Sequence, residues 1–202
     1  MTNSVGSSLG ITIKSEREIN LMRKSGVVTN NVKQLLRETI KSGMTTSDID
    51  VIAENQIRSE GAIPAFKGLY GFPATVCSSI NEEIVHGIPG NRVLLDGDIL
   101  SIDVGSIVEG YYSDSAFTMG IGSIKQKSVD LIQTTYDSLK VGIKEVKSGA
   151  RIGDISSAIQ QFAENSGYSV VREYVGHGIG RDLHEDPQIP NYGFPGEGPL
   201  LY

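Results

Sequence analysis

The stretch from Ile99 to Gly120, ILSIDVGSIVEGYYSDSAFTMG, predicts two antiparallel strands joined by a tight turn. We expect Glu109–Gly110 to form a two-residue loop, because glycine supports the positive φ that such loops need. Asp103 and Asp114 then lie on one face of the hairpin as diagonal neighbours. A loop at Val108–Glu109 would place the two aspartates directly opposite each other, and only an odd-residue loop without a bulge would separate them.

Two carboxylates on one face repel each other unless a cation, a shared proton or basic partners offset their charge. The alternative is that both are solvated on an exposed face of the hairpin. Apolar neighbours in both strands favour partial burial instead; they are Ile99, Ile102, Val104 and Phe117. The hairpin therefore predicts a metal site.

The three histidines stand in stretches that are rich in glycine and proline: His86 in EEIVHGIPG, and His177 and His184 in GHGIGRDLHEDP. A lone histidine is more often a loop or core residue than a ligand, but loops of this composition often carry function. Imidazole with carboxylate suits first-row transition metals, and bridging carboxylates suit two metals about 3.5–4 Å apart. Two aspartates and one histidine are too few ligands for two metals, and spacing favours none of the other carboxylates, Glu82, Glu83, Glu185 and Glu197.

A capping box of Ser15 and Glu18 predicts that a long helix begins near residue 16, and KSGM at 41–44 ends it. A second helix stops at Gly61, and residues 74–119 predict strands and turns. A further long helix and a short helix that stops at Gly167 follow, and SVVREYV at 169–175 predicts a strand. The long helix carries an apolar face of Ile132, Tyr136, Leu139, Ile143 and Val146.

The two halves of the chain repeat each other. Each half reads as a long helix, a KSG turn, a short helix, a glycine and a strand, with matched pairs Lys41/Lys147, Gly43/Gly149, Asp48/Asp154, Ile49/Ile155 and Gly61/Gly167. Caps and glycine stops also recur by chance, but five matches in one element order favour an internal duplication. A duplicated α-then-β unit can pack its sheets together with helices outside, leaving a cleft between the halves.

The composition excludes several classes of protein. Hydrophobic residues make up 39% of the chain and charged residues 21%, which is typical of a soluble globular protein. The net charge is −6 without a Lys/Arg cluster, which argues against nucleic-acid binding. No apolar run approaches the ~20 residues of a membrane span, so we expect a cytoplasmic protein. Cys77 is the only cysteine, and in TVCSSI it is better read as a buried apolar residue than as a nucleophile.

Three stretches resemble the signature motifs of type I methionine aminopeptidase. They are FKGLYGFPATVCSSINEEIVHGIPG (66–90), LLDGDILSIDVGSIVEGYYSDSAFTMG (94–120) and YSVVREYVGHGIGRDLHEDPQIPNYG (168–193). The resemblance implies the pita-bread fold, a duplicated α/β (α+β) architecture with an antiparallel sheet and helices on the outside. It covers a single domain at 13–202, preceded by a disordered tail at 1–12. It also implies removal of the initiator methionine from nascent proteins.

The resemblance further implies two divalent metal ions (Co, Mn, Fe or Zn), with Asp103 binding one, Asp114 bridging both and His177 binding the other. His86 would contact the substrate near its amino end, and His184 would hydrogen-bond the scissile carbonyl. Cys77, Phe72 and Phe66 would line or neighbour the methionine pocket. Leu69 and Leu183 depart from the residues common at their positions in the family and would alter that pocket.

The family has two more metal ligands, glutamates on closing strands, and this chain ends at PGEGPLLY before reaching them. We therefore expect a C-terminally truncated and inactive chain. Its partners would be nascent polypeptide N-termini, including those at the ribosome, with no nucleic acid or membrane, and the protein would be a monomer. Two alternatives remain: another pita-bread hydrolase such as an Xaa-Pro aminopeptidase, or a non-catalytic binding module of the same fold.

Overall fold

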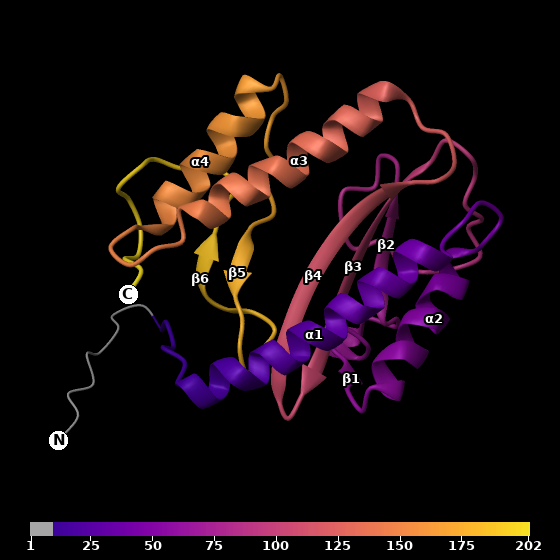
Figure 1. Cartoon of the computed structure of the whole chain (residues 1–202), viewed down its shortest axis with the longest axis horizontal. Coiled ribbons are helices and arrows are strands. Elements are labelled where there is room, and N and C mark those ends of the chain that lie inside the picture. The colour runs from indigo at the N-terminus through magenta and orange to yellow at the C-terminus, as the bar shows by residue number, and fades with distance from the viewer. Residues whose placement is uncertain (1–9) are drawn as a thin grey trace. The chain divides into compact units, whose positions relative to one another are not determined.

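The computed structural model describes residues 10–202, so most of the predicted tail at 1–12 lies outside the described residues. The chain forms two compact units (Figure 1). Unit 2 contains residues Lys14–Ser128 and Ile179–Leu183, and unit 1 contains residues up to Ile13, Val129–Gly178 and His184–Tyr202. The boundary between tail and domain stays a prediction.

Unit 2 is an antiparallel sheet with two helices on one face. Its elements are α1 (Glu16–Thr39), α2 (Thr46–Ser59), β1 (Ile63–Pro64), the 3-10 helix η1 (Leu69–Gly71), β2 (Val76–Ile80), β3 (Ile99–Val108) and β4 (Tyr111–Gly120). Strand β3 is central: β4 pairs with it along its whole length, and β2 and β1 follow one another along its other edge. Figure 1 shows α1 and α2 lying along this sheet.

The core of unit 2 lies between these helices and the sheet. Helix α1 begins at the predicted capping box, with the Ser15 N–H donating to Glu18 Oε2 at 2.8 Å. It buries Val28, Val32 and Leu36, which share one face because they are four residues apart. Alternate residues of β3 meet them, namely Leu100, Ile102 and Val104. Because strand side chains alternate, Asp103 points to the opposite face of the sheet.

Buried hydroxyls add a polar contact between α1 and the β3–β4 hairpin. The Ser25 hydroxyl donates to the Ser106 carbonyl at 2.8 Å. Thr29 Oγ1 shares hydrogen bonds with Ser106 Oγ at 3.0 Å and with Ser113 Oγ at 2.5 Å. Each buried hydroxyl in this group therefore has a partner, so burial of the group carries little desolvation cost.

Unit 1 contains α3 (Gln126–Lys144, except its first three residues), α4 (Ile152–Asn165), β5 (Gly176–Gly178) and β6 (Glu185–Ile189). Helix α3 packs on α4 through its small residues: a Cβ at Gly142 would lie 2.7 Å from the Ile159 side chain. Its predicted apolar face is not buried within the described chain. Tyr136, Leu139, Ile143 and Val146 are 53–59% exposed, while the buried residues of α3 are Ser138 and Gly142.

The structure reproduces the helices and the glycine turns of the predicted repeat. Helices α2 and α4 are both 14 residues long, and their N-termini carry equivalent contacts: Asp48 accepts the Thr45 N–H at 2.8 Å, and Asp154 accepts the Arg151 N–H at 2.7 Å. The matched Gly43 and Gly149 have φ values of +90° and +88°. Such values favour glycine, which explains why both turns carry it.

The predicted strand at 169–175 is wrong. SVVREYV forms no strand, and the ladder begins at β5, which pairs with β6. The stretch has suitable residues, but strand formation also needs a neighbouring strand, and the described residues provide none there.

No helix within residues 10–202 has the length and apolar character needed to cross a membrane.

Candidate active site

The β3–β4 hairpin has the predicted register. Glu109 and Gly110 form the loop with φ values of +49° and +82°, as a two-residue turn of this kind requires. Asp103 pairs with Ala116, and Gly105 pairs with Asp114. Both aspartates therefore lie on the face of the sheet that α1 does not cover, which confirms the prediction that they are neighbours on one face.

The two aspartates are close enough to interact. Burial raises the pKa of Asp114, whereas a hydrogen bond between its side chain and that of Asp103 lowers it, and burial is the larger effect. A partly desolvated carboxylate pair of this kind favours a proton or a cation between the two side chains.

The residues predicted to line a pocket form one apolar cluster on the same face of unit 2. Cys77 pairs with Asp103 across β2 and β3, so the two side chains share a face. The buried members of the cluster are Ala65, Phe66, Cys77 and Leu183, with Leu69, Phe72, Ile107, Tyr112 and Ile179 packed against them. Leu69 and Leu183 are therefore cluster residues.

The Cys77 thiol is not a nucleophile in this setting. Burial raises its pKa to about 12, and the negative charges of Asp103 and Asp114 act in the same direction. A thiol must ionise to attack a substrate, so almost none of it is reactive near neutral pH. This agrees with the interpretation of Cys77 as an apolar residue.

A short segment, Ile179–Leu183, completes the cluster. The Tyr112 N–H donates to the Gly180 carbonyl at 2.8 Å, and the Arg181 guanidinium lies 4.7 Å from the centre of the Tyr111 ring. Glu18 also faces this segment, at 3.9 Å from Arg181 Nε. The chain thus enters unit 2 directly after Gly178 and leaves it directly before His184.

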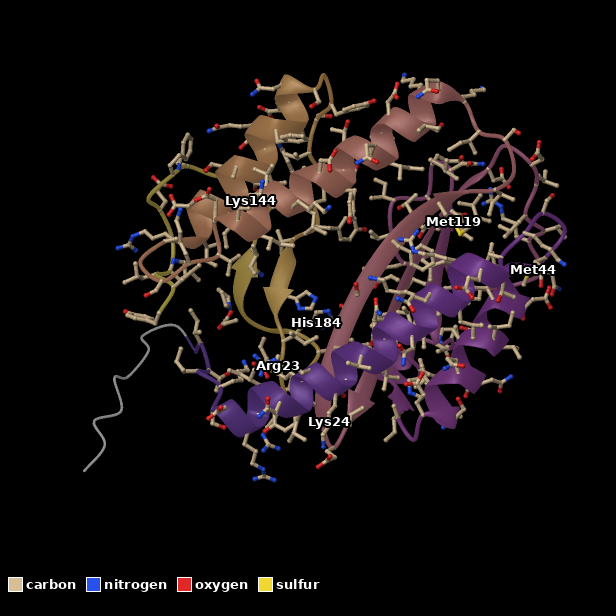
Figure 2. All side chains as sticks on the ribbon, viewed as in Figure 1. Arg23, Lys24, Met44, Met119, Lys144 and His184 are labelled. Carbon is tan, nitrogen blue, oxygen red and sulfur yellow. The ribbon has the colours of Figure 1, made fainter. Side chains whose placement is uncertain are left out.

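His177 and His184 lie together in unit 1, with ring centroids 4.5 Å apart and ring planes at 64° (His184 is labelled in Figure 2). His177 Nδ1 lies 2.9 Å from the Gly178 carbonyl. A carbonyl only accepts hydrogen bonds, so Nδ1 carries the proton, and Nε2 of a neutral ring keeps the lone pair that a metal needs. The two aspartates belong to unit 2, so the predicted proximity of His177 to them stays a prediction.

His86 lies in unit 2, in the loop after β2, and its backbone has a left-handed φ of +63°. Its side chain is exposed. The structure thus groups Asp103, Asp114 and the apolar cluster in one unit with the His86 loop, and the other two histidines in unit 1.

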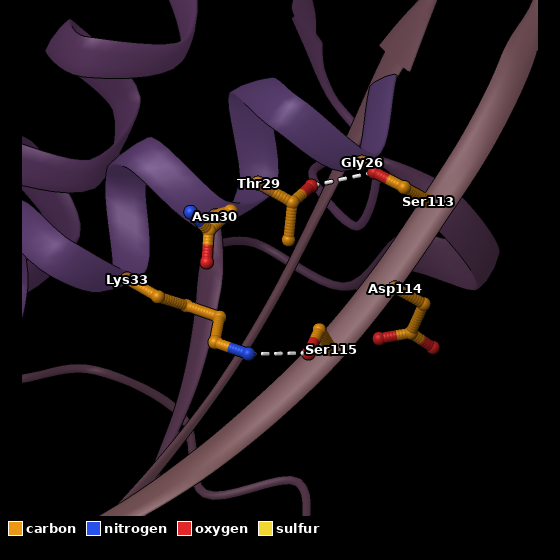
Figure 3. Close-up of a pocket in the computed structure, with 7 residues that line it drawn as sticks. All are labelled: Gly26, Thr29, Asn30, Lys33, Ser113, Asp114 and Ser115. Carbon is orange, nitrogen blue, oxygen red and sulfur yellow. Dashed lines mark hydrogen bonds between the residues drawn. The ribbon is translucent and has the colours of Figure 1, made fainter. Parts of the chain in front are cut away.

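Sequence reasoning missed a pocket of about 290 Å³ at α1 and β4 (Figure 3). It is lined by Gly26, Thr29, Asn30, Lys33, Ser113, Asp114 and Ser115. Lys33 Nζ donates to Ser115 Oγ at 2.6 Å, and burial lowers the pKa of Lys33 although the Asp103 charge raises it. Nothing in the helical pattern of α1 distinguishes Lys33 from a surface lysine, because its closeness to the carboxylates comes from tertiary packing.

A family model, metallopeptidase family M24, matches residues 20–201. The chain belongs to this family. This M24 chain is 51% identical to methionine aminopeptidase 1 of Bacillus subtilis over 191 residues. The aligned region covers 95% of this chain and 77% of the Bacillus protein.

Solved structures agree with this assignment. A methionine aminopeptidase structure from Thermotoga maritima superposes with a TM-score of 0.93 at 42% identity, covering 95% of this M24 chain and 77% of that one. A prolidase structure from Pyrococcus furiosus superposes with a TM-score of 0.82 at 22% identity, and the match covers 94% of this M24 chain and 54% of the prolidase. At this identity the likeness shows the fold alone. The comparisons confirm the predicted pita-bread fold and the resemblance to type I methionine aminopeptidase.

As a member of this metallopeptidase family, the chain is a metal-dependent hydrolase with a divalent metal cofactor. Asp103 and Asp114 fit part of the ligand set of such an ion, because their oxygen donors share a face and Asp114 is partly desolvated. Within residues 10–202, no group of three or more His, Cys, Asp or Glu side chains is arranged to hold a metal. Unit 2 therefore supplies two carboxylate ligands to a metal site, and a complete site needs further ligands from outside this pair.

Proposed function

We propose that this protein removes the N-terminal methionine from nascent polypeptides. The observation that carries the proposal is the cross-strand pairing of Cys77 with Asp103, which sets the apolar cluster beside the carboxylate pair. An unbranched thioether side chain suits a pocket made of aromatic rings, aliphatic side chains and a thiol. A methionine held there would have its peptide bond near the carboxylates.

In this proposal Asp103, Asp114 and His177 bind two divalent ions, which are cobalt, manganese, iron or zinc. When bound, such ions polarise a carbonyl and lower the pKa of a water molecule so that it can attack near neutral pH. Asp114 would be one of the residues that hold the ions, whose positive charge would offset the burial that raises its pKa. His177 would bind through Nε2, since Nδ1 is bonded to the Gly178 carbonyl.

The other two histidines act on the substrate in this proposal. His86 contacts the substrate near its amino end, and His184 donates a hydrogen bond to the scissile carbonyl as negative charge develops on its oxygen. His184 directly follows Leu183, which is buried in the apolar cluster. The methionine side chain packs on Phe66, Phe72 and Cys77, with Leu69 and Leu183 adjusting the width of the pocket.

We further propose that the enzyme is a monomer and that it meets its substrates in the cytoplasm, including at the ribosome.

The test uses the protein loaded with manganese or cobalt, both as residues 1–202 and extended at its C-terminus by the closing strands of the family. Hydrolysis of a Met-Ala peptide is compared with that of an Xaa-Pro peptide. We expect the extended form to cleave the Met-Ala peptide. A preference for the Xaa-Pro peptide would overturn the proposal.

Matched carboxamide variants test the assigned site. In the form extended with the closing strands, Asp103→Asn and Asp114→Asn should each lower kcat/KM by ~100-fold or more, about 2.7 kcal/mol of barrier. Glu38→Gln, an exposed carboxylate on α1, makes the same chemical change on the helix that covers the opposite face of the sheet and should leave activity unchanged. Equal effects of the three changes would show that the pair is not the site.

A further inference from the structure

The loop that follows β2 turns back and runs beside that strand. The Ser78 N–H donates to the Gly87 carbonyl at 2.8 Å, and the Gly87 N–H donates to Ser79 Oγ at 3.2 Å. Ser79 lies two residues after Cys77, so its side chain is on the face that carries Cys77 and Asp103. These two hydrogen bonds hold the residue before Gly87, which is His86, next to that face.

The turn that starts this loop is fixed independently. Asn81 adopts a φ of +56°, and its side chain accepts the Ile99 N–H at 3.0 Å and donates to Asp98 at 2.8 Å. Glu83 accepts the Ile80 N–H at 2.8 Å and pairs with Arg92 at 2.7 Å. The beginning of the loop is thus tied to β2 and β3, and Gly87 is its second anchor.

Gly87 approaches the strand too closely for any side chain. A Cβ at this position would lie 2.1 Å from the Ser78 carbonyl oxygen. His86 beside it has a φ of +63°, a left-handed conformation that is uncommon for residues with a side chain and that their surroundings can stabilise. The hydrogen bonds on either side of Gly87 are such surroundings, because they fix the peptide unit that follows His86.

We propose that Ser79 is a positioning residue for His86. Its hydroxyl accepts the Gly87 N–H, keeps the loop against β2 and holds His86 in the left-handed conformation that directs its imidazole. The proposal rests on the proposed function, in which His86 contacts the substrate. Ser79 is 4% exposed, so water cannot readily replace the lost acceptor when the hydroxyl is removed.

The neighbouring serine provides a matched control. Ser78 is 3% exposed and lies on the same strand, but its hydroxyl has no hydrogen-bond partner within residues 10–202. It points to the other face of the sheet. Ser78→Ala and Ser79→Ala therefore make the same chemical change at adjacent buried positions, and only the second removes the acceptor of Gly87.

The first test is amide hydrogen exchange at Gly87 in the full chain. We expect protection in the unsubstituted chain and in Ser78→Ala, and exchange at least ~10-fold faster in Ser79→Ala, with the Val32 and Leu36 amides of α1 unchanged as a measure of the stability of unit 2. Equal Gly87 exchange in the two variants would overturn the proposal, whatever the activity.

The second test is a double-mutant cycle with His86→Ala on a Met-Ala peptide, in the metal-loaded form that turns over. Ser79→Ala should lower kcat/KM by ~10-fold, Ser78→Ala should not, and Ser79→Ala should have no further effect once His86 is alanine. An inactive His86→Ala with an unaffected Ser79→Ala would overturn this inference alone. An active His86→Ala would overturn the role of His86 in the proposed function, and the inference with it.

Discussion

Gly105 is the residue on which the carboxylate face most depends. It pairs with Asp114, and a Cβ there would lie 2.7 Å from the Ser113 carbonyl oxygen and 2.9 Å from both Ala65 and the Phe66 ring. The absence of a side chain is what allows the Phe66 ring to lie against β3 at the position opposite Asp114. The same position thus serves the strand pairing and the apolar cluster.

We expect Gly105→Ala to lower the free energy of unfolding by about 1–3 kcal/mol, because the new methyl group overfills a packed site. Urea denaturation of the metal-free chain measures the change. Gly26→Ala is the control, since a Cβ at that α1 position meets no atom within 4 Å and alanine favours the helix. A Gly105→Ala chain as stable as the Gly26→Ala chain would contradict the close contact.

The pKa of Asp114 predicts how stability depends on pH. Because burial raises this pKa above the ordinary 3.8, the folded chain favours the protonated carboxyl. That contribution is complete below the ordinary pKa and is lost as pH rises through the raised one. Asp114→Asn should therefore raise the melting temperature of the metal-free chain at pH 7, and the gain should shrink toward pH 3.5. Glu38→Gln should show no such trend, and a gain at pH 7 that persists unchanged at low pH would refute the assignment.

For single residues, the sequence predicts the position of a side chain best where that position follows from regular backbone geometry. Strand alternation and a two-residue loop were enough to place Asp103 and Asp114 on one face. Lys33 could not be found in this way, since its approach to the carboxylates depends on how α1 packs on β4. The histidine roles came from motif resemblance, because spacing alone does not assign them.

Among the elements, the repeated helices offer a matched pair of substitutions. Asp48→Ala and Asp154→Ala remove equivalent cap contacts from α2 and α4. We expect each to destabilise the chain by about 1 kcal/mol. Asp154→Ala should cost more, because Asp154 also ties α4 to the distant Gly196 N–H at 2.7 Å, whereas the second bond of Asp48 comes from the Thr45 hydroxyl beside it, at 2.7 Å. Urea denaturation compares the two variants, and a larger loss for Asp48→Ala would contradict the additional contact.

Helix starts were predictable because a cap is a local interaction between residues three apart. Burial was harder to predict, because the exposed residues of α3 include its apolar face, while its buried residues are Ser138 and Gly142. SVVREYV failed as a strand for a related reason, since residue type sets a propensity and a neighbouring chain segment supplies the hydrogen bonds. Local patterns therefore predicted the elements better than their partners.

For the whole molecule, we expect residues 1–202 to be catalytically inactive and to bind metal weakly. Two carboxylates and one histidine leave part of the ligand set of two metals unfilled, and the resemblance to methionine aminopeptidase implies two further glutamate ligands. The measurement compares hydrolysis of a Met-Ala peptide by residues 1–202 and by the form extended with closing strands, each loaded with manganese or cobalt.

Turnover by residues 1–202 within about tenfold of the extended form, a barrier difference of ~1.4 kcal/mol, would show that the further glutamates are dispensable. The assigned mechanism would then fail. Titration calorimetry with manganese provides a second measurement, and comparable affinity of the two forms would lead to the same conclusion.

The buried thiol of Cys77 also makes the molecule suited to chemical labelling. It is the only cysteine, it is 6% exposed and its pKa is about 12, so a maleimide should react with the native chain only when the apolar cluster transiently opens. The labelling rate, followed by intact mass, thus reports opening events at a single known place. A fluorophore can meanwhile be attached to a cysteine introduced on the surface without competition from Cys77.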